Sequence, residues 1–277
     1  MSECEFDELR IYRGSDIQIT PKIIVTQPTI GQIADFGERR YFNAVHALTS
    51  VGADLKWQLW DYAGIDYTEI DDYDLFVQFI SQIVSSKKNL YRELTENPEK
   101  YEDELKQISE EQLEDMLYNP LELILKDIDL GDFTPCADKS TGQVVLYDIE
   151  HDITIDRVVY TRMVDVVRKI HGFKRNNEMP ANKRTKMDLI EDARDEAMMN
   201  ADKPYKSILK PLVSALSVKT GMCGDERIWN MPVNMFFDNI KRANKIQDSQ
   251  LLLQGAYSGF ASLKDVDNDR LNWAGDI

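Results

Sequence analysis

The sequence is poor in cysteine, glycine and proline and has no long hydrophobic run. Its 277 residues include only Cys4, Cys136 and Cys223, an odd number of distant thiols that excludes a disulfide framework and predicts a reducing compartment. The low counts of 13 Gly and 9 Pro exclude collagen-like and low-complexity chains. No apolar run approaches the roughly 20 residues of a membrane helix, and the acidic start of the chain does not resemble a signal peptide. These features predict a cytoplasmic globular protein.

The motifs of common enzymes and cofactor sites are also missing. The only histidines, His46, His151 and His171, have no nucleophile motif around them, and no phosphate-binding glycine loop occurs. The run Asp265-Val-Asp-Asn-Asp269 resembles the start of a calcium loop, but Arg270 stands where that loop needs glycine. We therefore expect a protein that is not an enzyme and has no cofactor or metal.

Acidic residues outnumber basic ones, and the excess lies in one half of the chain. There are 49 Asp and Glu against 33 Lys and Arg, a net charge of −16. Residues 1–150 hold 31 acidic and 13 basic residues, a net charge of −18, whereas residues 151–277 carry 18 and 20, a net charge of +2. We predict an acidic N-terminal module over 1–150 and a helical C-terminal module over 151–277.

One stretch of the second half, residues 168–186, is locally basic and contains turn-forming residues. Its cations form a candidate basic patch: Arg168, Lys169, Lys174, Arg175, Lys183, Arg184 and Lys186. Because the protein is acidic and Phe173 is the only aromatic residue among them, nucleic acid is not the expected partner. Two alternatives remain open: this loop docks on the acidic half of its own chain, or it binds an acidic partner.

The hydrophobic periodicity predicts an α+β, predominantly α-helical fold with small antiparallel β-hairpins near residues 9–26 and 133–147. In the first hairpin, Leu9–Arg13 is expected to pair with Ile17–Thr20. The sequence Thr29-Ile-Gly-Gln32 is a capping box that predicts a helix start. The apolar face of that helix continues through Gly37 to Leu48.

Further helices are expected along the rest of the chain. The predicted ranges are 53–62, 71–86, a restart at Asn119–Glu122, 155–170 ending at Gly172, 185–199 capped by Thr185, 204–218 bent at Pro211, and a long helix after Pro232. A further capping box at Ser109–Gln112 predicts another start.

With enzyme motifs missing, an interaction surface is the remaining candidate site. Trp57, Trp60, Trp229 and Trp273 are large side chains of the kind found at interfaces, although a role in the core is the alternative for them. We expect partner contacts from apolar residues on the long C-terminal helix and from Trp229 before it, which together form the candidate set Trp229, Phe236, Phe237, Ile240 and Leu252.

Four blocks of the sequence resemble proteins of the structural and assembly modules of tailed phages of Gram-positive hosts, and the last two are similar to tail assembly chaperones and neighbouring virion proteins. They are IIVTQPTIGQIADFGERRYF from Ile23, LKWQLWDYAGIDYTEI from Leu55, WNMPVNMFFDNI from Trp229, and LLQGAYSG from Leu252. The resemblance implies a tail assembly chaperone, an acidic helical protein that coats the hydrophobic tape measure protein until the tail tube polymerises around it. It assigns no site residues.

The resemblance leaves two roles open for the chain. As a chaperone it binds a tape measure protein or another phage structural protein in the host cytoplasm, and its 10 methionines suit varied apolar surfaces. As a virion component of the neck, head–tail connector or tail, it would instead form homo-oligomeric rings.

Overall fold

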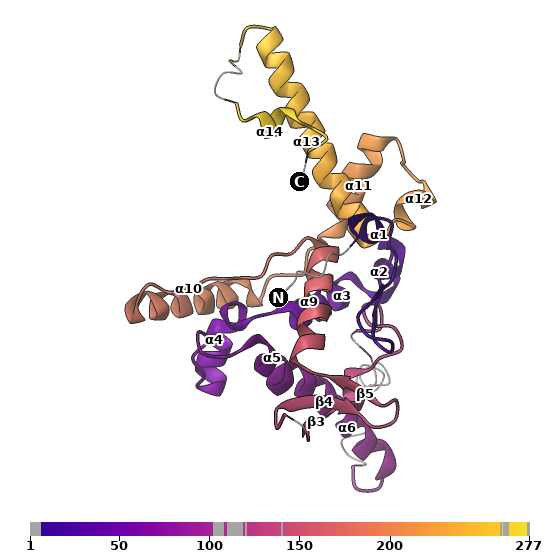
Figure 1. Cartoon of the computed structure of the whole chain (residues 1–277), viewed down its shortest axis with the longest axis vertical. Helices are drawn as coiled ribbons and strands as arrows, with labels where there is room; N and C mark the ends of the chain where they lie inside the picture. Colours follow the sequence, from indigo (N-terminus) through magenta and orange to yellow (C-terminus); the bar gives the residue numbers. More distant parts are fainter. Residues whose placement is uncertain are drawn as a thin grey trace.

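The computed structural model describes residues 7–101, 108, 109, 119, 121–139, 141–260, 262 and 266–275, excluding the side chains of residues 79–88. The fold is α+β and predominantly helical, as the periodicity predicts. Figure 1 shows a body around helix α9, with α10 extending to one side and the long helix α13 projecting away at the end opposite the strands. None of the helices in the described ranges has the length and hydropathy needed to cross a lipid bilayer.

The N-terminal part of the chain combines short helices with a two-stranded sheet. Strands β1 and β2 are antiparallel, with Ile17 opposite Val25. The elements in order are α1 (Glu8–Tyr12), β1 (Ile17–Gln18), β2 (Ile24–Val25), α2 (Ile30–Phe36), α3 (Glu38–Thr49), the 3-10 helix η1 (Gly52–Leu55), α4 (Lys56–Gln58), the π-helix η2 (Leu59–Ala63), α5 (Asp72–Leu75), the π-helix η3 (Phe76–Ser81) and α6 (Gln82–Glu96).

The middle of the chain forms a three-stranded antiparallel sheet of order β3-β4-β5, and the remainder is helical. The expected hairpin at 133–147 is confirmed, since Thr134 lies opposite Tyr147. The elements are the 3-10 helix η4 (Leu130–Asp132), β3 (Thr134–Ala137), β4 (Val144–Asp148), β5 (Ile153–Ile155), α9 (Arg157–His171), α10 (Lys183–Ala201), α11 (Leu209–Thr220), α12 (Glu226–Trp229), α13 (Val233–Tyr257) and α14 (Asn268–Leu271).

One large hydrophobic core takes residues from both sides of residue 150. Helix α9 lies at its centre and packs against α3, α5, α13, β2 and β5. The helical spacing of apolar residues along α9 explains this position. Met163, Val166 and Val167 are fully buried, whereas Arg162 and Asp165 face solvent. Other fully buried side chains in this core are Tyr41, Phe76, Leu125, Leu146 and Phe236.

Several expected helix ends are confirmed by their caps. The Thr29 hydroxyl accepts from the Gln32 amide at 3.2 Å, while Gln32 Oε1 accepts from the Thr29 amide at 2.8 Å. Helix α9 ends at Gly172, whose φ of 65° is left-handed. These ends depend on local hydrogen bonds and on backbone conformations that glycine allows, so they can be predicted from short sequences.

The expected strand Leu9–Arg13 is wrong. These residues belong to α1 and its C-terminal cap, because the Asp7 carboxylate accepts from the amides of Leu9 and Arg10. The N-terminal strand pair is therefore β1 with β2, within the predicted range of 9–26 but with different partners. The Asp7 cap favours a helical turn over an extended chain.

The predicted continuous helix through Gly37 is also wrong. Gly37 has φ of 101° and ψ of 107° and separates α2 from α3. That backbone conformation is one that residues with a side chain rarely adopt, so glycine here turns the chain instead of allowing two helices to approach.

Three smaller predictions need correction. Asn119 accepts from the Leu121 amide at 2.9 Å, but residues 121–124 form turns and no helix restarts there. Helix α10 is capped by Asn182, not by Thr185.

Helix α11 begins at Leu209, where Glu38 accepts from the Ile208 and Leu209 amides at 2.6 and 2.7 Å, so Pro211 lies in its first turn. The predicted capping box at 109–112 lies partly outside the described residues.

Candidate functional site

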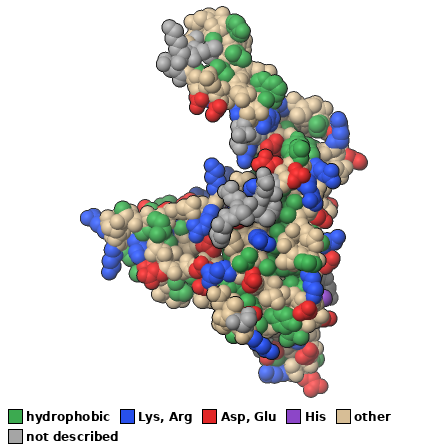
Figure 2. Space-filling view, in the orientation of Figure 1, with side chains coloured by type: hydrophobic (Ala, Val, Ile, Leu, Met, Phe, Trp, Pro, Cys, Tyr) green, Lys and Arg blue, Asp and Glu red, His purple; other side chains and the backbone are tan. Residues whose placement is uncertain are grey.

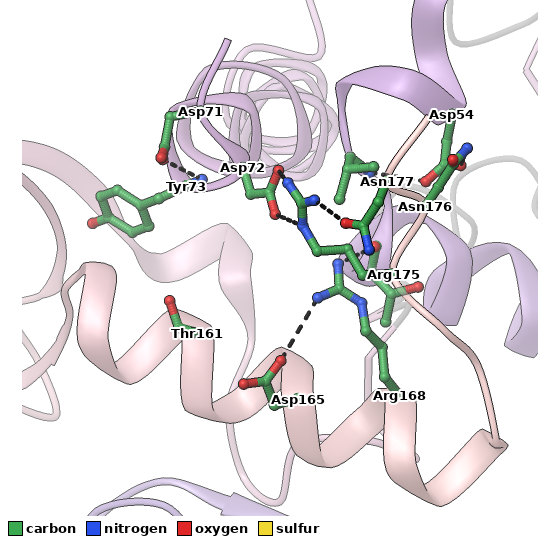
Figure 3. Close-up of polar contacts among 12 residues, drawn as sticks. Asp54, Asp71, Asp72, Tyr73, Thr161, Asp165, Arg168, Arg175, Asn176 and Asn177 are labelled. Carbon is green, nitrogen blue, oxygen red and sulfur yellow. Dashed lines mark hydrogen bonds and ion pairs between the residues drawn. The ribbon is translucent and has the colours of Figure 1, made fainter. Parts of the chain in front are cut away.

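The basic loop docks on the acidic half of the same chain, which confirms one of the two alternatives left open by the sequence. Arg175 forms a bidentate ion pair with Asp72, with Nε and Nη2 each 2.9 Å from a carboxylate oxygen. Asn176 donates to Asp54 at 2.8 Å, and Arg175 also donates to Asn177. Figure 3 shows Arg175 from the loop reaching Asp72 at the start of α5.

The same contact surface continues along α10. Lys186 pairs with Asp66, and Arg194 Nε and Nη2 each lie 2.7 Å from an oxygen of Asp61. Lys56 pairs with Glu178 in the opposite sense, with the cation on the acidic half. We call these contacts between residues 54–72 and residues 175–194 the charged seam.

Hydrogen bonds in the charged seam stabilise ionised carboxylates. Hydrogen bonding from Arg194 lowers the pKa of Asp61. Burial raises the pKa of Asp66, but hydrogen bonds from Lys186 and Thr68 outweigh burial and leave the pKa below its ordinary value. Asp72 raises the pKa of Arg175 through their hydrogen bonds. These shifts favour the charged forms of Asp61, Asp66 and Arg175.

A second, small hydrophobic core lies beside the charged seam. It contains Val51, Leu59, Tyr67 and Leu75 from the acidic half and only Ile190, fully buried, and the half-buried Met187 from α10. Trp57 and Trp60 pack against it, which is the core role that the sequence left open for them. Helix α10 therefore contacts the body through these two apolar side chains and through the charged seam.

The seven residues of the predicted basic patch divide into different groups. Arg175 and Lys186 belong to the charged seam, and the buried Arg168 donates to the Thr49 carbonyl at 2.7 Å and faces Asp165. Lys174, Lys183 and Arg184 are exposed, and no described residue forms an ion pair or hydrogen bond with their side chains. Lys169 lines a cavity of about 500 Å³ between α1, α9 and α13. The structure therefore does not gather the seven cations into one surface.

The predicted partner-binding residues also differ in their positions. Phe236 is fully buried in the large core, so its side chain offers no surface to a partner in this structure. Phe237 and Ile240 are half-buried against the same core, whereas Trp229 on α12 is 44% exposed. Leu252 lies farther along α13 and is half-buried.

The most exposed apolar side chains of this region are neighbours of the predicted ones. Leu251 is 59% exposed, Tyr257 89%, Phe260 93% and Trp273 56%. They lie on residues 241–260 together with 266–275, which we call the C-terminal arm. Its far end projects from the body (Figure 1). Figure 2 shows hydrophobic side chains along this arm. The sequence signal was the continuation of apolar residues at 251–253, beyond the stretch that packs on the body.

Polar contacts fold the C-terminal arm back on itself. Arg270 pairs with Asp248 through two nitrogens at 2.9–3.1 Å, and the buried Ser249 hydroxyl donates to the Leu271 carbonyl at 3.0 Å. Arg242 donates to the carbonyls of Trp273 and Gly275 at 2.7 and 2.6 Å. These contacts hold α14 against α13 and leave Tyr257 and Phe260 at the exposed end.

His171 and His151 form side-chain hydrogen bonds that position their rings. His171 is buried, and its Nδ1 lies 2.7 Å from the Val167 carbonyl, so Nδ1 carries the proton and Nε2 accepts from the Tyr41 hydroxyl at 2.6 Å. Burial lowers the pKa of His171 to about 4. His151 is exposed and its Nδ1 lies 2.7 Å from Asp148, whose hydrogen bond raises the pKa of His151.

Comparison of the chain with models of known protein families, with curated protein sequences and with solved structures gave no match.

Proposed function

We propose that this chain is a non-enzymatic assembly protein of a tailed phage, a tail assembly chaperone whose C-terminal arm binds apolar helices of a tape measure protein. The observation that supports the proposal most directly is the exposure of Leu251, Tyr257 and Phe260 on the C-terminal arm. Clustered exposed side chains of this kind are typical of interaction surfaces.

The geometry of the arm suits a helical partner. Helix α13 is 25 residues long, and its last turns carry the exposed side chains of Leu251 and Tyr257. Burying a large apolar side chain contributes roughly 1.5–3 kcal/mol, and several such contacts along two helices give a useful affinity. The net charge of −18 on residues 1–150 would keep neighbouring coated complexes apart in the host cytoplasm.

Co-purification with the tape measure protein of the same phage tests the proposal. Tyr257→Asp/Phe260→Asp should reduce the amount of tape measure protein recovered with the chain at least tenfold, because both side chains are exposed and replaceable without unfolding. The matched control is Ile149→Asp/Val158→Asp, which adds the same charge at two exposed apolar positions of the body. Equal recovery with the two double variants would contradict the proposal.

Mass spectrometry of purified virions separates this role from that of a virion component. A chaperone leaves before the particle is complete, so the chain should be missing from virions. Its presence at a fixed ratio to the tail proteins would favour the neck, connector or tail role instead.

A further inference from the structure

A cavity of about 560 Å³ opens on the acidic half of the chain, away from the charged seam and the C-terminal arm. Its walls come from Asp16, from the stretch after β2, from Asn119 and residues 122–132, and from His151. Hydrogen bonds hold these walls together: the Thr26 amide donates to the Ile124 carbonyl at 2.9 Å, and the Lys126 amide donates to the Ile24 carbonyl at 3.1 Å. Backbone hydrogen bonds to β2 and to the residue after it therefore fix one wall of the cavity.

Acidic groups dominate the lining of this cavity. Its five carboxylates are those of Asp16, Glu122, Asp127, Asp129 and Asp132, against the single ammonium group of Lys126 and the imidazole of His151. Asp16, Glu122 and Asp127 are exposed, and within the described part of the chain no residue donates a hydrogen bond or ion pair to their side chains. The lining thus offers acceptors that have no donor.

Gln27 adds an independent acceptor to the same wall. Its side chain is more than nine-tenths buried, and its Nε2 donates to the carbonyls of Ile11 and Ser15 at 3.0 and 3.3 Å. These two bonds fix the orientation of the amide, so Oε1 is the remaining acceptor, and no residue that the structure describes donates a hydrogen bond to it. A buried acceptor without a donor costs stability unless a ligand satisfies it.

A cation with several N–H groups would complement this lining, because it could donate to several carboxylates at once. Among the described residues, no group of three His, Cys, Asp or Glu side chains is placed to hold a metal ion. The volume lies within the range of pockets that hold organic ligands, and the exposed rim is accessible to a macromolecule. Guanidinium and ammonium groups provide the required donors and charge.

We propose that this acidic cavity binds an arginine- or lysine-rich segment of a partner protein. The site is separate from the apolar surface of the C-terminal arm and does not depend on it. A partner with basic residues would gain affinity and orientation from the cavity, and its association would weaken as salt rises.

Titration of the full chain with an acetylated tetra-arginine peptide, followed by calorimetry at about 50 mM salt, tests the proposal. Asp16→Asn/Glu122→Gln/Asp127→Asn should weaken binding at least tenfold. Asparagine suits position 127, where φ is 56°, because it adopts left-handed conformations readily. The matched control, Asp188→Asn/Asp192→Asn/Glu196→Gln on α10, removes the same charge from exposed positions and should change affinity less than twofold.

Two further measurements make the test specific. The side-chain NH₂ signal of Gln27 in a ¹H–¹⁵N spectrum should shift when the peptide binds the wild type, and this shift should be lost in the cavity variant. Equal weakening by the two triple variants would show attraction to net charge alone and would overturn the proposal. Binding of spermidine as tight as that of the peptide would also overturn it, in favour of a small polyamine.

Discussion

Arg175 and Asp72, which are 103 positions apart in the sequence, face each other through two parallel hydrogen bonds of 2.9 Å. Their pairing joins the loop before α10 to the first turn of α5, and it is one of several contacts that fasten the neutral half of the chain to its acidic half. Some acidic residues of the first half are thus neutralised by basic residues of the second half of the same chain.

Loss of this ion pair should loosen α10 without unfolding the protein. In Arg175→Gln we expect faster hydrogen exchange in α10, with a stability loss of at most about 1 kcal/mol because the guanidinium is half-exposed. Arg184→Gln is the matched control, since Arg184 is exposed. Identical exchange in the two variants would mean that the pair does not hold α10.

The two adjacent phenylalanines of α13 should respond differently to truncation. Phe236→Ala leaves a cavity in the large core and is expected to cost about 3–5 kcal/mol, measured by urea unfolding. Phe237→Ala should cost less because that side chain is half-buried, and Tyr257→Ala on the arm should change stability by no more than about 0.5 kcal/mol. A smaller loss for Phe236 than for Phe237 would contradict the core placement.

The buried His171 should make the protein less stable in mild acid. Burial holds its folded pKa near 4, below the value of about 6.5 in the unfolded chain, so the unfolded chain takes up the proton first as the pH falls. The neutral His171 therefore lowers the free energy of unfolding by little above pH 6.5, and stability falls progressively as the pH drops from 6.5 to 4.

The expected loss from this residue between pH 7.5 and pH 5 is about 2 kcal/mol. Urea unfolding at both pH values should show that His171→Gln loses less stability on acidification than the wild type. Because other groups titrate equally in the two proteins, the difference isolates His171. Parallel pH profiles would show that its imidazole is not held neutral.

The break between α2 and α3 should depend on glycine. Gly37→Ala places a side chain at φ of 101° and should cost about 1–3 kcal/mol in thermal or urea unfolding. Gly64→Ala is a useful comparison, because Gly64 has φ of 63° in the less costly left-handed helical region and an added Cβ would meet open space. A cost at Gly37 no greater than at Gly64 would argue that the two helices can merge.

Local signals in the sequence predicted much of the fold. The capping box at Thr29, the hairpin around residues 138–142 and the stop at Gly172 each depend on a few neighbouring residues, and each is confirmed. Leu9–Arg13 was misassigned because its alternating apolar residues suggest a strand while the Asp7 cap favours a helix. The hydrophobic spacing correctly predicted helices before and after Gly37. It could not predict the break between them, because spacing carries no information about a positive φ.

Long-range contacts could be anticipated only in outline. The charge asymmetry left open whether the basic loop docks on the acidic half of its own chain or binds an acidic partner, and the pairing of Arg175 with Asp72 depends on the folded chain between them. Likewise, the apolar face of α13 was visible in the sequence, whereas its division into a buried start at Phe236 and an exposed end at Tyr257 depends on where the body stops. The acidic cavity had no sequence signal, because its residues come from four separate segments.

Hydrogen exchange of the chain in the presence and absence of its tape measure protein would test the proposed binding surface most directly. If the C-terminal arm binds an apolar helix, amides of residues 244–257 should become at least tenfold more protected in the complex, while those of β3–β5 remain unchanged. Unchanged exchange along the arm in a complex that forms stably would contradict the account.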